Sequence, residues 1–359
     1  MTMAADTFLY PEIDKLRCVR CGRCSEVCAK CSDSKLKASV SCVAAVSKND
    51  AVFAHSSSGG AFAAIVDSLY EIYKKQYPLF FVVGASWNEQ LQVCHTIVEY
   101  AGPDSLRCLQ SSKYVQSSTC GIYKKVKNLL ADQSHFVVFS GTPCQVAGLK
   151  AFVGSSPNNL FCIDLICKGG PSQKVFDKYK EGLEKKFGLK ISSYQFRCKE
   201  RLDNGTLYTR SVRIGLSDGR VLRLSRLEDE YLRMFYSRLP KFREACVNCR
   251  YKSVERVGDM TIGDAWGIDK LYPQLKAIHG VSLVLGMTVR AAALKVLLAE
   301  RMCLYPCRLM DIAADNSFAC DYDPTPEFDK EQYYQDICDK SMSFEQCVQK
   351  GIDRINERE

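Results

Sequence analysis

The chain has 359 residues, 47% of them apolar and 25% charged, which is enough for one large or two medium domains with a sizeable core. The net charge of +8 is modest and the charges are scattered, so we expect no nucleic-acid partner. No run of about 18 apolar residues occurs and the N-terminus lacks the pattern of a secretory signal, so we expect no membrane span and a cytoplasmic location.

Cysteine is the unusual component, with 20 cysteines against 4 histidines. A secreted disulfide framework would favour a short chain with a signal peptide, and the sequence has neither feature. In a reducing compartment, closely spaced cysteines are more often metal ligands. A chain that is rich in thiols and poor in histidine favours iron–sulfur chemistry first and an all-cysteine zinc site second.

Residues 1–33 form a short, loop-like and cysteine-rich module with almost no apolar core of its own. Its spacing C-x2-C-x2-C-x3-C is typical of a 4Fe-4S site and comes from four cysteines, Cys18, Cys21, Cys24 and Cys28. No second run of this kind is present, and Ala29 stands where such runs usually have proline. The fourth ligand is therefore Cys28, Cys31 or Cys42. A zinc knuckle and thiols without a ligand role are the other interpretations.

After a linker at 34–58, segments with helical periodicity alternate with apolar strand-like runs. In chain order we expect a helix at about 60–75, strands at 79–87 and 92–100, a helix at 121–132, a strand at 135–141, a helix at 142–153, a strand at 159–167 and a helix from about 171 to 188. Three antiparallel strands follow at 191–198, 206–215 and 220–226, then a helix at 228–239, a strand at 280–288 and a helix at 289–302. This order predicts an α/β fold in which flanking helices cover a mixed sheet core, with a small ferredoxin-like iron–sulfur module at the N-terminus.

Two of the expected strands lead to a cysteine beside a glycine-containing turn. Cys144 stands where the helix after the strand 135–141 begins, and Cys167 ends the strand 159–167. A helix N-terminus stabilises a thiolate, and ligands of open α/β folds bind at the carboxyl ends of the strands. Each residue is equally consistent with a buried structural thiol.

Cys246 and Cys249 form a separate C-x-x-C pair. Zinc binding, a redox dithiol and cluster ligation all fit such a pair on its own. Together with Cys144 and Cys167 it makes a four-thiolate set from three segments. This set is our prediction for a second cluster.

Small hydroxyl and glycine residues also precede several helices, in "SSSGG" (56–60), "SSKYVQS" (111–117) and "GTPCQ" (141–145). Backbone N–H groups in such turns can bind phosphate. Lys113 would add positive charge and Tyr114 would stack on a flat ring. The alternative for each stretch is an ordinary turn or helix cap.

Six stretches occur in one order: "SSSGGAFAAI", "SKYVQS", "FSGTPCQVAGLKAF", "DLICKGGPS", "FRCK" and "CVNCRYKSVERVGDMTIGDAWGI". Together they resemble the coenzyme F-420 hydrogenase/dehydrogenase beta subunit family, over about residues 15–310. The resemblance implies an FAD-bearing protein with 4Fe-4S clusters, two in this chain. It also implies an N-terminal family domain at 34–130, a C-terminal FAD and iron–sulfur domain at 131–310, and a peripheral segment at 311–359.

The resemblance assigns residues to both cofactors. The flavin region by motif is Ser57, Ser58, Gly59, Gly60, Ser112, Lys113, Tyr114, Gln116 and Thr142. The inner-cluster cysteines by motif are Cys144, Cys167, Cys246 and Cys249. Asp264 and Trp266 belong to the closing "GDAWGI" signature, where we expect Asp264 to line the site or support it.

The chain departs from the family pattern in two ways. Lys168 replaces a histidine that many members carry, so we assign it a catalytic role or the binding of a phosphate or carboxylate. The first of two ferredoxin runs found in many relatives is absent, which suggests an upstream redox partner.

The leading hypothesis is an oxidoreductase. Electrons would pass from a donor such as ferredoxin or another redox subunit through the clusters to FAD, and then to a small-molecule acceptor, a deazaflavin or another compound. A non-catalytic electron-transfer or assembly subunit and a zinc-stabilised binding protein are the alternatives.

Overall fold

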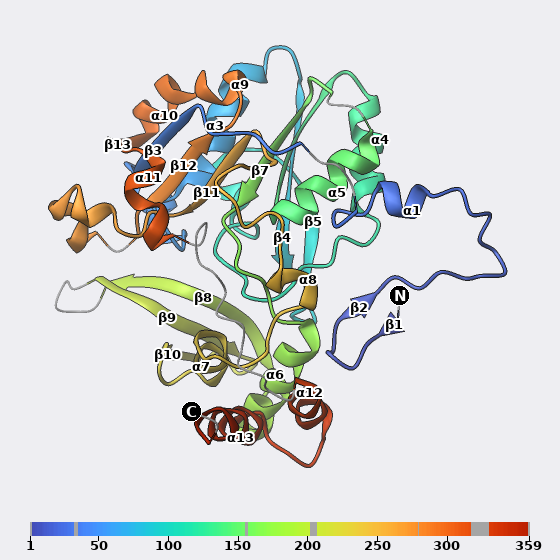
Figure 1. The fold of residues 1–359 in the computed structure, drawn as a ribbon. Coiled ribbons are helices and arrows are strands. Elements are labelled where there is room, and N and C mark those ends of the chain that lie inside the picture. The colour runs from blue at the N-terminus through green and yellow to red at the C-terminus, as the bar shows by residue number, and fades with distance from the viewer. Residues whose placement is uncertain are drawn as a thin grey trace.

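An eight-stranded mixed sheet forms the larger part of the fold, in a computed structural model that describes residues 2–31, 35–154, 157–201, 207–278, 280–316 and 330–357. Its strands lie in the order β13 (Met302–Pro306), β3 (Ser41–Ser47), β12 (Ser282–Gly286), β11 (Met260–Asp264), β7 (Leu160–Leu165), β6 (His135–Gly141), β4 (Leu79–Trp87) and β5 (Val93–Glu99). The pairs β4–β6, β6–β7 and β7–β11 are parallel, and the other neighbours are antiparallel. The predicted α/β fold with a mixed sheet is therefore confirmed (Figure 1).

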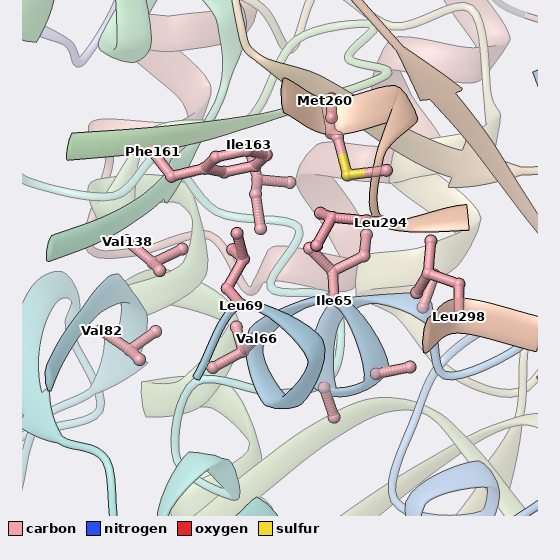
Figure 2. Packing of buried hydrophobic residues seen from close by; sticks show 14 of the residues in the cluster. Ile65, Val66, Leu69, Val82, Val138, Phe161, Ile163, Met260, Leu294 and Leu298 are labelled. Atoms are coloured by element: carbon pink, nitrogen blue, oxygen red, sulfur yellow. The ribbon is translucent and has the colours of Figure 1, made fainter. Parts of the chain in front are cut away.

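Helices cover both faces of this sheet. One face is covered by α3 (Ala61–Tyr73), α9 (Val289–Ala292) and α10 (Lys295–Arg301), and the other by α4 (Ile122–Ala131) and α5 (Pro143–Val153). Successive residues of a strand point to opposite faces. Accordingly, Val138 of β6 packs in the first core and its neighbour Val137 packs in the second. Figure 2 shows the first core, where Leu69 of α3 lies beside Val138 and Phe161 of the strands.

A second, smaller layer lies below the large sheet in Figure 1 and has its own apolar core. An antiparallel sheet in the order β10 (Val221–Ser225), β9 (Leu207–Leu216) and β8 (Ile191–Arg201) packs with the helices α6 (Gln173–Phe187), α7 (Glu230–Tyr236), α12 (Lys330–Cys338) and α13 (Phe344–Asn356). Tyr333 of α12 and Phe344 of α13 are buried in this core. The C-terminal segment, which we expected to be peripheral, thus contributes two helices to the fold.

The remaining elements are short. They are the hairpin of β1 (Thr2–Met3) and β2 (Leu9–Tyr10), and the helices α1 (Arg23–Glu26), α2 (Asp50–Ala54), η1 (Pro103–Leu106), α8 (Glu244–Val247), η2 (Ile268–Lys270), η3 (Pro273–Ala277), α11 (Leu309–Ile312) and η4 (Ala313–Asp315). The chain before α1 lies at the periphery in Figure 1, and Leu16 is 99% exposed there, so this module has little core of its own. Within the described ranges, no helix is long and apolar enough to cross a membrane.

The structure departs from the expected elements in several places, and one of them is the central strand β11, which was not expected. The expected linker at 34–58 contains β3, which lies inside the sheet between β13 and β12 and buries Ala44 and Ala45 completely. Its small side chains give a weak strand signal, because strand preference reflects branched and aromatic residues. The helix expected at 289–302 is divided into α9 and α10, and the chain then continues as the edge strand β13.

Candidate functional site

Two of the predicted inner cysteines follow adjacent parallel strands. Cys144 lies in the first turn of α5, directly after β6. Thr142, which we predicted for the flavin region, caps this helix together with Gln145, and its Oγ1 lies 3.2 Å from Cys144 Sγ. Cys167 lies two residues beyond β7, because that strand ends at Leu165 and not at residue 167.

The four predicted inner thiols lie within electrostatic reach of one another. Burial is the main reason why the pKa of Cys167 rises to about 12, and charge on Cys144, Cys246 and Cys249 adds to the rise. Burial likewise raises the pKa of Cys246 to about 11, with contributions from Cys144 and Cys249. Cys144 is exposed at the surface, yet the protein around it desolvates its thiol and raises its pKa. Thiols that disfavour charge on one another become thiolates when a bound metal group supplies positive charge.

A buried ion pair holds two of these segments together. Asp164 of β7 and Arg256 pair at 3.0 Å, with only 0% and 2% of their side chains exposed. The Asp164 carboxylate also accepts hydrogen bonds from the N–H groups of Val257 and Gly258 and from the Thr261 hydroxyl. The stretch that follows the C-x-x-C pair is thereby fixed against β7.

A zinc ion and a 4Fe-4S cluster require different spacings of four thiolates. Four thiolates around one zinc ion, with bonds of ~2.3 Å, would lie about 3.8 Å from one another. Within the described part of the chain, no three His, Cys, Asp or Glu side chains form a group that could hold a metal ion. A 4Fe-4S cubane is wider than a single ion and holds its four cysteine sulfurs further apart.

The N-terminal cysteines lie mostly at the surface. The side chain of Cys28 is half-buried, whereas three are exposed, those of Cys18, Cys21 and Cys24. Burial acts to raise the pKa of Cys28, but hydrogen bonds from Lys30 and Cys31 outweigh this effect and the pKa is lowered. The thiol of Cys31 is hydrogen-bonded to that of Cys28, which raises the pKa of Cys31. Cys31 is thus close enough to Cys28 to share or replace it as a ligand.

Cys42, the third candidate for the fourth ligand, lies elsewhere. It belongs to β3, and its Sγ is 3.5 Å from the Sγ of Cys307. Figure 1 shows β3 well apart from α1, around which the other N-terminal cysteines are arranged. The choice is therefore between Cys28 and Cys31.

The N-terminal module contacts the segment that carries the inner C-x-x-C pair. The Tyr251 hydroxyl donates a hydrogen bond to the Ala29 carbonyl oxygen at 2.7 Å. The backbones of Lys37 and Arg256 exchange two hydrogen bonds, at 2.7 and 2.8 Å. Ala29 and Cys249 also pack against one apolar cluster. The N-terminal cysteines and the inner C-x-x-C pair therefore lie on two chain segments that contact each other.

A cavity of about 280 Å³ lies where β8 meets the end of β11. Its polar lining consists of Ser57, Arg197, Lys199, Asp264, Asp269 and Lys276. Arg197 and Asp264 form a bidentate ion pair with distances of 2.6 and 3.0 Å. Arg197 has a φ of +52°, which is uncommon for a residue other than glycine and often marks a functional site. The volume is near the lower end of the range for small-molecule sites, so it suits one part of a large cofactor.

Lys199 is a second cation at this cavity. Its ammonium group donates hydrogen bonds to the carbonyl oxygens of Phe53 and Ser58 and lies 3.4 Å from the centre of the Phe53 ring. Burial, with a contribution from the positive charge of Arg197, lowers the pKa of Lys199 to about 7. An amine that titrates near neutral pH beside open space can hold an anionic ligand group or donate a proton.

The predicted loop at 56–60 borders the cavity. Ser57 lines the cavity, and its hydroxyl oxygen accepts a hydrogen bond from the Ser112 N–H at 2.9 Å. The Ser58 hydroxyl donates to the Val281 carbonyl oxygen at 3.0 Å. These contacts fix the position of the loop but leave its surface towards the cavity available.

The two glycines of this loop are required by close packing and by backbone conformation. A Cβ on Gly59 would lie 2.1 Å from the Ala45 carbonyl oxygen, and the Gly59 N–H donates to the Ser282 hydroxyl. Gly60 has a φ of +90° and begins α3. The positive end of the α3 dipole is therefore beside the cavity.

Lys113 and Tyr114 have other contacts than we expected. The Lys113 ammonium donates to the carbonyl oxygens of Cys108 and Gln110, and burial lowers its pKa to about 8. The Tyr114 ring packs against Phe235, with 4.5 Å between ring centroids. Neither Lys113 nor Tyr114 is among the residues that line the cavity, so both support the site indirectly.

The segment "SSKYVQS" joins the cavity to the inner thiol set. At one end, Ser112 contacts the cavity-lining Ser57. At the other end, the side-chain amide of Gln145, the residue after Cys144, donates to the Ser117 carbonyl oxygen at 3.1 Å. A single short segment therefore touches both parts of the predicted site.

Two predicted residues remain. Gln116 donates its N–H to the Pro171 carbonyl oxygen at 2.8 Å and accepts a hydrogen bond from Arg243, so it ties the segment to the turn after Cys167. Lys168 is exposed within that turn.

Arg197 and Lys199 are the site residues that sequence reasoning missed. They lie two positions apart in "FRCK", which we noted only as part of the resemblance. Two residues at that spacing on a strand point to the same side of the sheet. The sequence could therefore have indicated a pair of cations on one face of this strand.

The comparison with family models agrees with the predicted resemblance. Residues 135–304, which contain the four inner cysteines, match the family model that describes the C terminus of the coenzyme F420 hydrogenase/dehydrogenase beta subunit. A chain in a solved structure of the F420-reducing NiFe hydrogenase complex from Methanosarcina barkeri is similar, at 15% identity and a TM-score of 0.49, covering 90% of this chain and 92% of that chain. A search of curated proteins found no significant match.

Proposed function

Over residues 135–304 this chain belongs to the coenzyme F420 hydrogenase/dehydrogenase beta subunit family, a redox family, and from this membership we propose that it is an iron–sulfur flavoprotein oxidoreductase. Electrons would enter at a cluster near Cys18–Cys28, pass to a cluster on the inner thiols, and reach FAD beside the cavity. The observation that carries this proposal is the segment 111–117, which contacts Gln145, the residue after Cys144, and Ser57 at the cavity.

The residues of the chain have distinct tasks in this proposal. Ser57, Arg197 and Lys199 would hold the anionic and polar groups of FAD, because they present a hydroxyl and two cations to one cavity. Asp264 neutralises Arg197 in part and fixes its guanidinium plane. When bound, the flavin supplies the conversion between one-electron and two-electron transfer.

The path between the two clusters is supported by the contacts of the N-terminal module. Tyr251 lies two residues after Cys249 and donates to the carbonyl oxygen of Ala29, the residue after Cys28. The exposed run beyond it is accessible to a donor protein such as ferredoxin or another redox subunit. Lys168, exposed beside Cys167, is our candidate for contact with a small-molecule acceptor, a deazaflavin or another compound.

The test is metal and flavin analysis of protein purified without oxygen. We expect iron, sulfide and flavin, with two 4Fe-4S clusters per chain. Cys246→Ala should remove about half of the iron, because one of two like clusters loses a ligand. Cys303→Ala is the matched control, since Cys303 is exposed on β13 outside both sets, and it should retain all of the iron.

Other results would contradict the proposal. Colourless protein with stoichiometric zinc would favour a zinc-stabilised binding protein. Flavin without turnover of deazaflavin, nicotinamide or ferredoxin couples would favour a non-catalytic electron-transfer subunit. Unchanged iron in the Cys246→Ala variant would refute the inner-cluster assignment.

A further inference from the structure

Two cysteines outside both predicted cluster sets face each other across neighbouring strands. The antiparallel register of β3 and β13 pairs Pro306 with Val43, and one further step places Cys307 opposite Cys42. Their Sγ atoms are 3.5 Å apart. Directly opposed residues in antiparallel strands have Cα atoms about 4.5–5.5 Å apart, which lies within the range that a disulfide spans. The pair can therefore close without a rearrangement of the backbone.

The two thiols also differ in acidity and are accessible. Both side chains are half-buried. The hydrogen bond between them is the main reason why the pKa of Cys42 is raised and the pKa of Cys307 is lowered. Since the thiolate is the attacking species in disulfide exchange, the direction of these shifts favours Cys307 as the attacking thiol.

We propose that Cys42 and Cys307 are a redox-sensitive dithiol that forms a reversible disulfide by exchange with a low-molecular-weight disulfide. The Cys307 thiolate attacks one sulfur of that disulfide and releases the first small thiol. The Cys42 sulfur, on losing its proton, then attacks Cys307 Sγ in the mixed disulfide and releases the second small thiol. Two protein thiols are oxidised and one small disulfide is reduced, so two electrons and two protons pass to the released thiols.

The bond would fasten the chain that supports one wall of the cavity. The segment after Cys307 runs through α11 and η4 to Asp315, which pairs with Lys270 at 2.6 Å. The next residue, Asn316, donates from its side chain to the Trp266 carbonyl oxygen at 2.9 Å. Trp266 lines the cavity. Oxidation would therefore link the segment that supports this wall covalently to β3, which lies inside the large sheet.

The cysteine pair and the cavity wall also share one apolar cluster. Cys42 and Cys307 pack against the buried group that includes Ile268 and Leu275, and both of these residues line the cavity. A change in the pair is thus transmitted through packed side chains as well as along the chain. This inference depends on the cavity and not on which cofactor occupies it.

The test uses the whole protein, kept free of oxygen, in buffers with increasing ratios of oxidised to reduced glutathione. Samples are quenched with N-ethylmaleimide, digested without reduction and analysed by mass spectrometry. We expect a cross-linked peptide containing Cys42 and Cys307 that increases with the oxidised fraction and is lost after reduction. Cys307→Ser should abolish this peptide, and Cys303→Ser, at an exposed site on the same strand, should retain it. Separate modification of Cys42 and Cys307 at every ratio would overturn the proposal.

A second measurement tests the effect on the cavity wall. Hydrogen exchange of the backbone around residues 266–270 should be slower in the oxidised protein than in the reduced protein. In the Cys307→Ser variant the two conditions should give the same exchange rate. Equal rates in oxidised and reduced wild-type protein would show that the bond does not fasten the wall and would refute that part of the inference.

Discussion

Replacement of Asp164 by asparagine tests the ion pair that positions the inner thiol set. In the native protein Oδ2 accepts the N–H groups of Val257 and Gly258, and Oδ1 accepts Arg256 and the Thr261 hydroxyl. Asparagine removes the charge and places an amide NH₂ where one of these oxygens stands. Either orientation leaves buried donors facing a donor.

The expected cost is large. Breaking a buried ion pair by removal of one charge costs about 3–5 kcal/mol, because the other charge is left uncompensated. Each buried N–H that loses its acceptor adds about 1–3 kcal/mol. These terms are not additive, so we expect a loss of at least ~4 kcal/mol. That is a large share of the roughly 5–15 kcal/mol by which folded domains are stable.

Urea denaturation of Asp164→Asn measures this loss. The matched control is Asp218→Asn, whose carboxylate is 35% exposed and pairs with an Arg220 side chain that is 64% exposed. An exposed pair contributes about 0–1 kcal/mol, so the control should unfold close to wild type. Iron content is measured in parallel, and it should fall in Asp164→Asn alone. If the two variants differ by less than ~1 kcal/mol, the argument from burial is wrong.

Three further predictions follow from single residues. The pKa of Lys199 is lowered to about 7 in the folded protein, whereas an unfolded lysine titrates near about 10.4, so unfolding takes up a proton between these pH values and the free energy of unfolding rises with pH in that window. Urea denaturation of Lys199→Met should therefore show a smaller rise in stability between pH 7 and pH 9 than wild type. An unchanged slope would count against the pKa shift. Gly59→Ala should lower the melting temperature, because the added Cβ would meet the Ala45 carbonyl oxygen. The control is Gly182→Ala in α6, which has no atom within 4 Å of the added Cβ and should stabilise the protein by about 0.5–1 kcal/mol. Equal melting temperatures of the two variants would contradict the close approach at Gly59. Cys28→Ser should remove iron from the N-terminal site while Cys42→Ser leaves the iron content unchanged, and iron loss in Cys42→Ser would restore Cys42 as a ligand candidate.

The helices and strands that could be predicted are those whose burial is indicated by a local pattern of apolar residues. The strand at 135–141 was predicted with the bounds of β6 because "HFVVFSG" is an unbroken apolar run, as expected for a strand covered on both faces. The strand β3 was missed because Ala44 and Ala45 are small. Gly59 also lies directly against the carbonyl oxygen of Ala45, a contact that no local pattern reveals.

The site was predictable where the chemistry of single residues is specific. Cysteine spacing and strand ends selected four thiols that the fold brings into electrostatic reach of one another, and their role as cluster ligands stays a prediction. The pair of Arg197 and Asp264 joins residues 67 positions apart, so neither residue indicates the other in the sequence. The contacts of Lys113 could not be read from the sequence for a related reason. Its charge suggested a ligand contact, but the nearest carbonyl oxygens of its own loop bind it.

The hydrogen bond from Tyr251 to Ala29 indicates an order in which two parts of the protein fold. The N-terminal module has little core of its own and rests on backbone and side-chain partners that immediately follow the inner C-x-x-C pair. Those partners reach their positions only once the inner segment is folded against β7. The N-terminal module can therefore take its place only on a surface that the folded inner segment provides.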